Sequence, residues 1–142
     1  MKRLTIINIT SGLLSFLFIY TGTTKLLEHS DFLSQLQSFP LLQYHPLLFS
    51  FLVPFTELVI AFGLIINQTI LPALRASFVL LFVFTTYLVL MLFTNKDLPC
   101  PCGGIISALT WKQHVALNLF LILLTVFAIK SMNKEKTTAM DL

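Results

Sequence analysis

The chain has 142 residues, of which 56% are hydrophobic and only 11% are charged, and its mean hydropathy is +0.89. A soluble domain usually carries about 25% charged residues, so this composition excludes a water-soluble globular protein and predicts a membrane protein in contact with lipid. The net charge of +3 does not indicate a nucleic-acid partner, because basic residues near the ends of membrane spans are explained by topology and no nucleic-acid-binding motif is present.

Four apolar stretches follow one another along the chain, at residues 4–27, 47–67, 73–94 and 111–129. Each is about 20 residues long, which lets an α-helix cross a hydrocarbon core of roughly 30 Å. None offers a polar face wide enough to cover the others, which excludes the buried helices of a soluble protein. The sequence therefore predicts an all-α fold, a single domain formed by an integral membrane bundle of four transmembrane helices.

The first stretch begins after Lys2 and Arg3, as the apolar region of a secretory signal peptide does. It is longer than most such regions, and Tyr20-Thr-Gly-Thr-Thr-Lys25 at its end lacks a convincing small-x-small cleavage site. We therefore expect the first stretch to be retained as a span.

The loop at residues 28–46 is the longest connection before the third stretch. Its apolar residues are interspersed with polar ones, at Phe32, Leu33, Leu36, Phe39, Leu41 and Leu42. This pattern predicts a short amphipathic helix lying at the membrane interface.

The second stretch carries Glu57 about ten residues from its start, roughly 15 Å along a helix. A carboxylate at that depth is costly unless it is protonated, paired or facing a polar cavity. Lys25, near the end of the first stretch, is the cation placed to approach it, and Pro54 is expected to weaken the helix one turn earlier. Two interpretations stay open: a structural ion pair, or a group that handles protons or contacts a quinone.

Both cysteines of the chain lie in the loop at residues 95–110, in the sequence Asp97-Leu-Pro-Cys-Pro-Cys-Gly-Gly104. Residues separated by one other have Cα atoms roughly 5.5–7 Å apart, so a Cys100–Cys102 disulfide is feasible but strained, which makes it easier to reduce. The alternatives are that the cysteines are incidental, or that they bind copper(I) or zinc with help from His114, His29 or His45.

The fourth stretch places three polar or aromatic residues on one helix face beneath the cysteine loop, Trp111, His114 and Asn118. His114 is the candidate positive group that would favour a cysteine thiolate. Asn118, with Thr85 and Thr86 of the third stretch, is most simply interpreted as an interhelical hydrogen-bonding group.

Basic residues indicate the orientation. Six of them fall on one predicted side, at Lys2, Arg3, Arg75, Lys130, Lys134 and Lys136, against Lys25, Lys96 and Lys112 on the other. By the positive-inside rule both termini and the tail at residues 131–142 are cytoplasmic, and the cysteine loop is extracytoplasmic, where disulfides persist.

Taken in order, these motifs resemble the MauE/DoxX-like membrane proteins over nearly the whole chain. The resemblance implies a role in periplasmic disulfide formation or thiol maturation in the bacterial inner membrane, alongside a thioredoxin-like partner. The positions that match are Lys25, Pro54, Glu57, Cys100, Cys102, Trp111 and Asn118.

Two classes of function are therefore carried forward. The first is a thiol-disulfide oxidoreductase that uses Cys100, Cys102 and His114; by analogy with other four-span disulfide enzymes its electrons pass to a quinone near Lys25, Glu57, Trp111 and Asn118. The second is a non-enzymatic subunit or anchor of a larger membrane complex, with the cysteines structural or, together with His114, binding copper or zinc.

Overall fold

The computed structural model describes residues 2–94 and 109–141, without the side chains of Thr94 and Trp111. All regular structure in these ranges is helical: α1 (Lys2–Leu27), α2 (His29–Ser38), α3 (Pro46–Ile65), α4 (Ile70–Thr94) and α5 (Trp111–Met140). Four of these helices, all except α2, are long and apolar enough to cross a membrane. The predicted all-α bundle of four transmembrane helices is confirmed.

Specific residues favour the starts of α3 and α5 and the turn between α3 and α4. Pro46 stands in the first turn of α3, where its missing N–H is no loss. Thr110 caps α5: its side chain accepts a hydrogen bond from the Gln113 N–H, and the Gln113 side chain accepts one from the Thr110 N–H. Between α3 and α4, the Thr69 hydroxyl donates to the Gly63 carbonyl and closes the turn.

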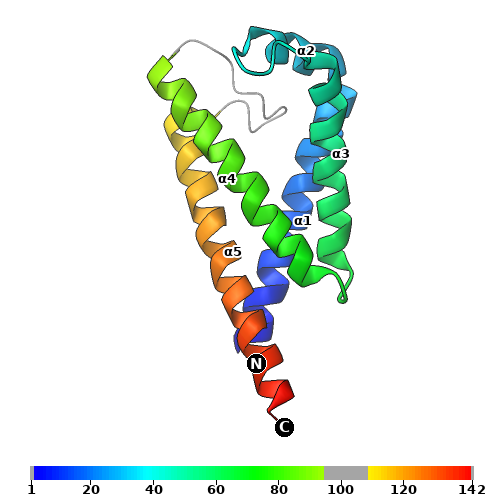
Figure 1. Cartoon of the computed structure of the whole chain (residues 1–142), viewed down its shortest axis with the longest axis vertical. Helices are drawn as coiled ribbons and strands as arrows, with labels where there is room; N and C mark the ends of the chain where they lie inside the picture. Colours follow the sequence, from blue (N-terminus) through cyan, green and yellow to red (C-terminus); the bar gives the residue numbers. More distant parts are fainter. Residues whose placement is uncertain (1, 95–108, 142) are drawn as a thin grey trace.

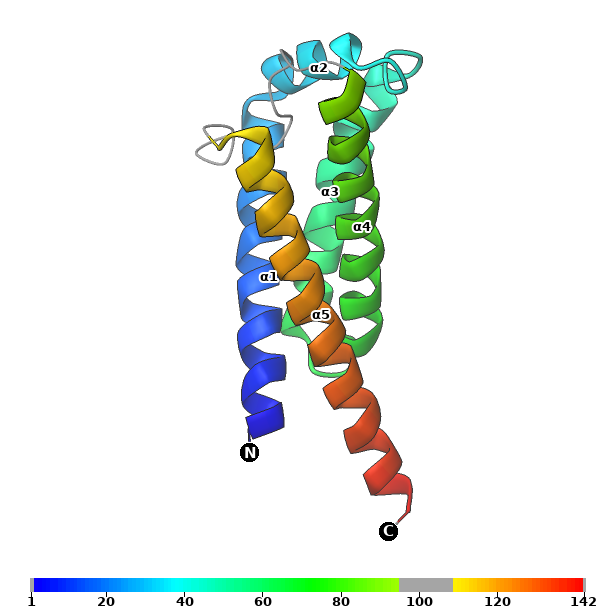
Figure 2. The same ribbon diagram turned by 90° about the vertical axis from the view of Figure 1, so that its left-hand side faces the viewer.

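The long helices alternate in direction, so both termini lie at one end of the bundle, together with the α3–α4 turn. We call this the terminal end and the opposite one the α2 end, because α2 lies across it (Figure 2). The last part of α5 extends beyond the other helices at the terminal end (Figure 2). α2 is held on α3 by a 3.0 Å hydrogen bond between His29 Nε2 and Ser50 Oγ and by stacking of His29 on Phe51.

The packing is uneven around the bundle. α1 packs most extensively on α3, and α4 on α5. α3 and α4 are joined by a short turn yet diverge toward the α2 end (Figure 1). The core is correspondingly continuous in the terminal half, where it includes Ile7, Leu14, Ala61, Leu64, Leu74 and Ala128.

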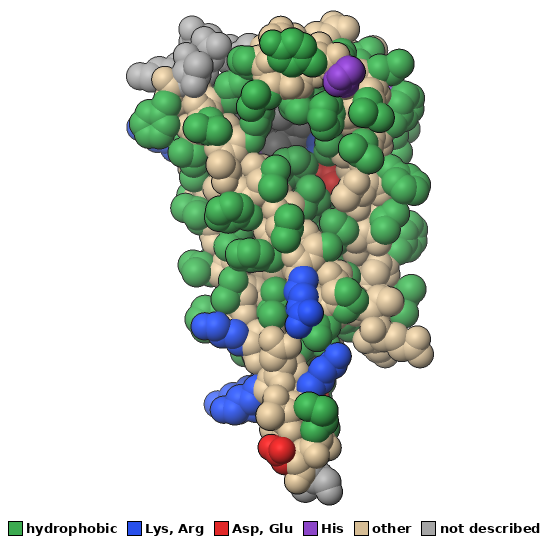
Figure 3. All heavy atoms as spheres, viewed as in Figure 1, with side chains coloured by type: hydrophobic (Ala, Val, Ile, Leu, Met, Phe, Trp, Pro, Cys, Tyr) green, Lys and Arg blue, Asp and Glu red, His purple; other side chains and the backbone are tan. Residues whose placement is uncertain are grey.

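The outer surface matches a lipid environment. Apolar side chains dominate the face in Figure 3, and most of the Lys and Arg side chains visible there lie toward the terminal end. Arg75, Lys130, Lys134 and Lys136 are all exposed. The chain is thus a multi-pass membrane protein, and the assignment of the terminal end to the cytoplasm stays a prediction.

Candidate functional site

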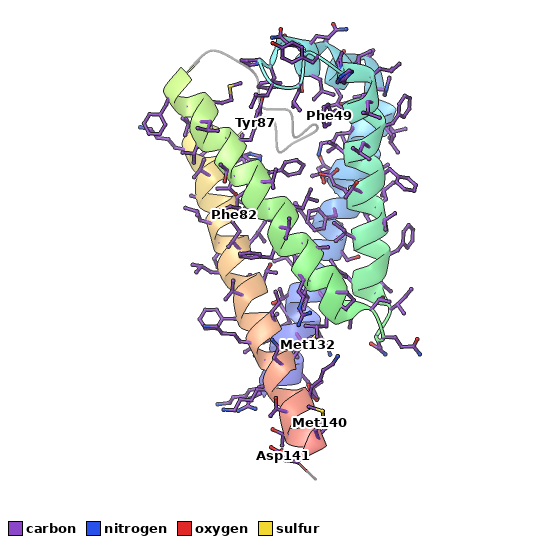
Figure 4. All side chains as sticks on the ribbon, viewed as in Figure 1. Phe49, Phe82, Tyr87, Met132, Met140 and Asp141 are labelled. Atoms are coloured by element: carbon purple, nitrogen blue, oxygen red, sulfur yellow. The ribbon has the colours of Figure 1, made fainter. Side chains whose placement is uncertain are left out.

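A cavity of about 310 Å³ lies among α1, α3, α4 and α5 in the half of the bundle toward the α2 end. Its walls are almost entirely apolar, and α2 contributes Phe32 and Leu36 to them. Figure 3 shows the hollow between α3 and α4, with acidic and basic side-chain atoms in its depth. Tyr87 of α4 and Phe49 of α3 lie near its α2 end (Figure 4) and both line it.

An ion pair is built into the wall of this cavity. Lys25 Nζ of α1 lies 2.5 Å from Glu57 Oε1 of α3, and the two side chains are only 4% and 2% exposed. Every other charged side chain that the structure describes is exposed. The predicted approach of Lys25 to Glu57 is confirmed, and the pairing explains how two charges are tolerated inside the span.

The surroundings of Lys25 hold its ammonium group in place. The Nζ atom lies 5.7 Å from the centroid of the Phe32 ring and 5.4 Å from that of Phe84, distances at which an aromatic face attracts a cation. Lys25 also belongs to the last turn of α1, where the helix dipole favours positive charge. The cation is therefore fixed from three sides by α2, α3 and α4.

Several polar atoms of the cavity wall are left without partners. Glu57 Oε2, Thr21 Oγ1 and Tyr87 Oη are buried and accept or donate no hydrogen bond within the described part of the chain. Thr21 lies one turn before Lys25, on the same buried face of α1. Such atoms are costly to bury, so each calls for an explanation such as strain, a catalytic role or a bound partner.

His114 and Asn118 of α5 also line the cavity. They are 3% and 7% exposed and lie one turn apart, so the predicted shared helix face is present. The Thr110 cap fixes the start of α5 and with it the position of His114 in the first turn. The structure thus brings four predicted site residues to one cavity, Lys25, Glu57, His114 and Asn118.

Three predicted residues are not placed. Cys100 and Cys102 lie outside the described residues, as does the side chain of Trp111. The segment that carries the cysteines is nevertheless attached at the α2 end, because α4 ends at Thr94 and α5 begins at Trp111 there (Figure 1). The candidate site is therefore built from the cavity residues alone.

The histidines of the metal alternative are separated in the fold. His29 bonds to Ser50, His45 precedes α3 at its exposed start, and His114 faces the cavity. Within residues 2–94 and 109–141, no three His, Cys, Asp or Glu side chains are close enough to hold a metal ion.

Sequence reasoning missed two cavity residues and misassigned two threonines. Thr21 could have been found from its i, i+4 spacing to Lys25, whereas nothing in the sequence gives the direction of Tyr87. Within the described residues, the hydroxyls of Thr85 and Thr86 donate to the carbonyls of Leu81 and Phe82 of their own helix and not to a neighbouring helix. The i−4 carbonyl is always within reach of a helical threonine, so no neighbouring helix is needed.

The family model of the methylamine utilisation protein MauE matches residues 3–131. The chain belongs to the MauE family. The match covers nearly all of the bundle, including the four cavity residues named above, and the DoxX part of the predicted resemblance stays a prediction. Searches of curated proteins and of solved structures gave no match to this MauE-family chain.

Proposed function

We propose that this MauE-family protein is a membrane-embedded thiol-disulfide redox protein, which exchanges a Cys100–Cys102 disulfide with a thioredoxin-like partner on the extracytoplasmic side of the bacterial inner membrane. One observation carries the proposal. The two cysteines of the chain belong to the segment attached at the α2 end, and that end also holds the buried Lys25–Glu57 pair and His114.

The orientation in this proposal rests on charge. The exposed cations Arg75, Lys130, Lys134 and Lys136 gather toward the terminal end, which favours that end as cytoplasmic by the positive-inside rule. The segment at residues 95–108 then faces a compartment in which disulfides persist.

The exchange itself balances without any further reagent. A thiolate of the reduced partner attacks one sulfur of the Cys100–Cys102 bond, which breaks, and a mixed disulfide forms. The second partner thiolate then attacks that mixed disulfide and releases the protein with two thiols. The partner loses two electrons and two protons, and the protein gains both.

His114 is proposed to support this chemistry as a positioning residue. It is buried in the first turn of α5, four residues after the end of the loop at residues 95–110 that carries the cysteines. A histidine that becomes positively charged near a cysteine stabilises the thiolate, which is the attacking and leaving form.

The experiment is a thiol-trapping assay in intact cells. Cells are quenched with acid, free thiols are alkylated with a mass tag, and the tagged cysteines are counted with and without a thioredoxin-like partner. We expect disulfide occupancy to change with the partner, and Cys100→Ser or Cys102→Ser to abolish partner oxidation. His114→Ala should slow the exchange and shift its pH profile, whereas His45→Ala, at the exposed start of α3, should do neither.

Two results of the same assay would overturn the proposal. A disulfide whose occupancy never changes favours the non-enzymatic subunit or anchor of a larger complex. Two permanently reduced thiols favour copper or zinc binding, which metal analysis of the purified protein would then measure.

A further inference from the structure

We propose that the cavity between α3 and α4 binds the ring of a lipid-soluble quinone, which takes up the electrons that the cysteine pair collects. This inference rests on the proposed function and names the acceptor class for it. It is argued from the size, access, polarity and charge of the cavity.

Size and access point to a ring that enters from the bilayer. The cavity volume of about 310 Å³ is at the lower end of the roughly 300–1,000 Å³ usual for small-molecule sites. It therefore suits one substituted ring rather than a whole lipid. Two lining residues, Leu52 of α3 and Val83 of α4, are 48% and 55% exposed, so the cavity wall reaches the outer surface of the bundle at these two helices. A ring held in the cavity would therefore lie close to the lipid into which a hydrophobic tail can extend.

The unpartnered polar atoms define what the ring must carry. The hydroxyls of Thr21 and Tyr87 can donate hydrogen bonds, whereas an ionised Glu57 Oε2 can only accept one. A quinone presents carbonyl oxygens that accept from the hydroxyls, and its reduced form, the quinol, presents hydroxyls that donate to the carboxylate. An acyl chain offers none of these atoms a hydrogen-bond partner.

The charges in the cavity wall favour a ligand with a neutral head group. Lys25 and Glu57 neutralise each other at 2.5 Å, so the wall of the cavity carries no net charge from this pair. A phosphate or carboxylate head group would bring an unpaired anion next to Glu57, which is costly in an apolar surrounding. Quinone and quinol are both neutral and fit this condition in either redox state.

Repeated turnover needs an electron acceptor because the chain has only two cysteines. After one exchange both are thiols, and the chain has no second cysteine pair whose disulfide could reoxidise them. With a quinone the step balances: the S–S bond forms again, the two thiols lose two electrons and two protons, and the quinone gains both and becomes a quinol.

The test measures quinone binding without thiol chemistry. The full-length protein carrying both Cys100→Ser and Cys102→Ser is purified in detergent and labelled with a short-chain azidobenzoquinone, and the labelled peptides are mapped by mass spectrometry. Decylubiquinone and decanoic acid are added as competitors of equal chain length. We expect label on α3 and α4 peptides that line the cavity, and competition by decylubiquinone only.

Matched variants locate the binding. Val53 lines the cavity and Val59 faces outward on the same helix, so Val53→Trp should abolish labelling and Val59→Trp should preserve it. Tyr87→Phe should weaken quinone binding about three- to tenfold, the value of one hydrogen bond. Tyr44→Phe, at a site that is 75% exposed, should not change it. The Tyr87 hydroxyl has no partner within the described chain, so Tyr87→Phe removes no hydrogen bond that the described residues make. This variant therefore tests quinone binding even if the Val53→Trp protein does not fold.

Two outcomes overturn the inference: label that both competitors displace equally, which indicates an acyl-chain site, and label that is indifferent to Val53→Trp and Tyr87→Phe. The result is separable from the proposed function because the tested protein has no thiols. Quinone binding combined with a thiol pair that never cycles would refute the proposed exchange, and cycling thiols without quinone binding would refute this inference alone.

Discussion

The two halves of the bundle are built from the same four helices but differ in what they bury. In the terminal half the buried side chains are apolar or carry small hydroxyl groups, as Thr10 and Ser77 do, and the charged side chains Lys2, Arg3 and Arg75 all lie on the outside. In the half toward the α2 end, an ion pair is inside the bundle and a cavity separates α3 from α4. Within the described residues, buried charge is therefore confined to the half toward the α2 end.

Small residues explain how the terminal half closes. The Ser15 hydroxyl of α1 donates to the Ala61 carbonyl of α3 at 3.1 Å, a distance that requires the two helices to approach closely. Gly63 lies near Ala73, and a Cβ placed on it would come within 3.1 Å of the Ala73 Cβ. Toward the α2 end the cavity is lined instead by large side chains such as Phe84 and Tyr87, and the interior there is held by charge as well as by packing.

Removing one charge of the buried pair should have the largest effect on stability. Lys25→Met leaves Glu57 alone in an apolar surrounding, and breaking a buried pair in this way usually costs about 3–5 kcal/mol. We expect a loss of that size in the free energy of unfolding, measured by titrating the protein with SDS in mixed micelles. The double variant Lys25→Met with Glu57→Leu should regain most of it, because no charge is left unpaired.

The matched control for this prediction lies in the other half. Arg75 is exposed near the start of α4, so Arg75→Met should change the free energy of unfolding by no more than about 0.5 kcal/mol. Equal losses for Lys25→Met and Arg75→Met would contradict the division of the bundle into a half that buries charge and one that does not.

A smaller effect is expected where α1 crosses α3 near the cavity. A Cβ on Gly22 would lie 3.2 Å from the Pro54 carbonyl oxygen and 3.2 Å from Leu58 Cγ, and the carbonyl cannot move away freely. Gly22→Ala should therefore cost about 1–3 kcal/mol through overpacking. Gly12→Ala, on the same helix with nothing within 4 Å, should be neutral or stabilise the helix by up to about 1 kcal/mol.

The same SDS titration measures the free energy of unfolding of both glycine variants. A Gly22→Ala protein as stable as Gly12→Ala would mean that α1 and α3 separate easily at this level. The close contact between them would then contribute little to holding Lys25 against Glu57.

Much of this fold could be predicted from the sequence. Four spans follow from stretch length and apolar content, and the cost of a carboxylate at membrane depth directs attention to Glu57 and to the nearest cation, Lys25. His114 and Asn118 follow from helical spacing alone. Each of these predictions depends on the length, spacing or charge of residues within single helices and not on how the helices pack together.

What could not be predicted depends on how the helices are rotated and tilted against each other. The divergence of α3 and α4 creates the cavity, yet both helices are apolar enough to cross a membrane, so composition does not mark where they separate. Tyr87 faces the cavity and Thr86, the preceding residue, faces outward. In an apolar span no polar face distinguishes these two directions, so sequence pattern gives no sign of them.

The smallest expected effect tests whether hydrogen bonds hold the terminal half. Ser15→Ala removes the bond to the Ala61 carbonyl, and interhelical hydrogen bonds in membranes average about 0.6 kcal/mol. We expect a loss of that order in the SDS titration. Thr86→Val removes a hydroxyl that bonds only to the Phe82 carbonyl of its own helix on the outer surface, so its loss should be smaller still. A Ser15→Ala cost well above 1 kcal/mol would show that the terminal half, like the half with the ion pair, depends on a polar contact; the contrast between the halves would then lie in charge and not in polarity.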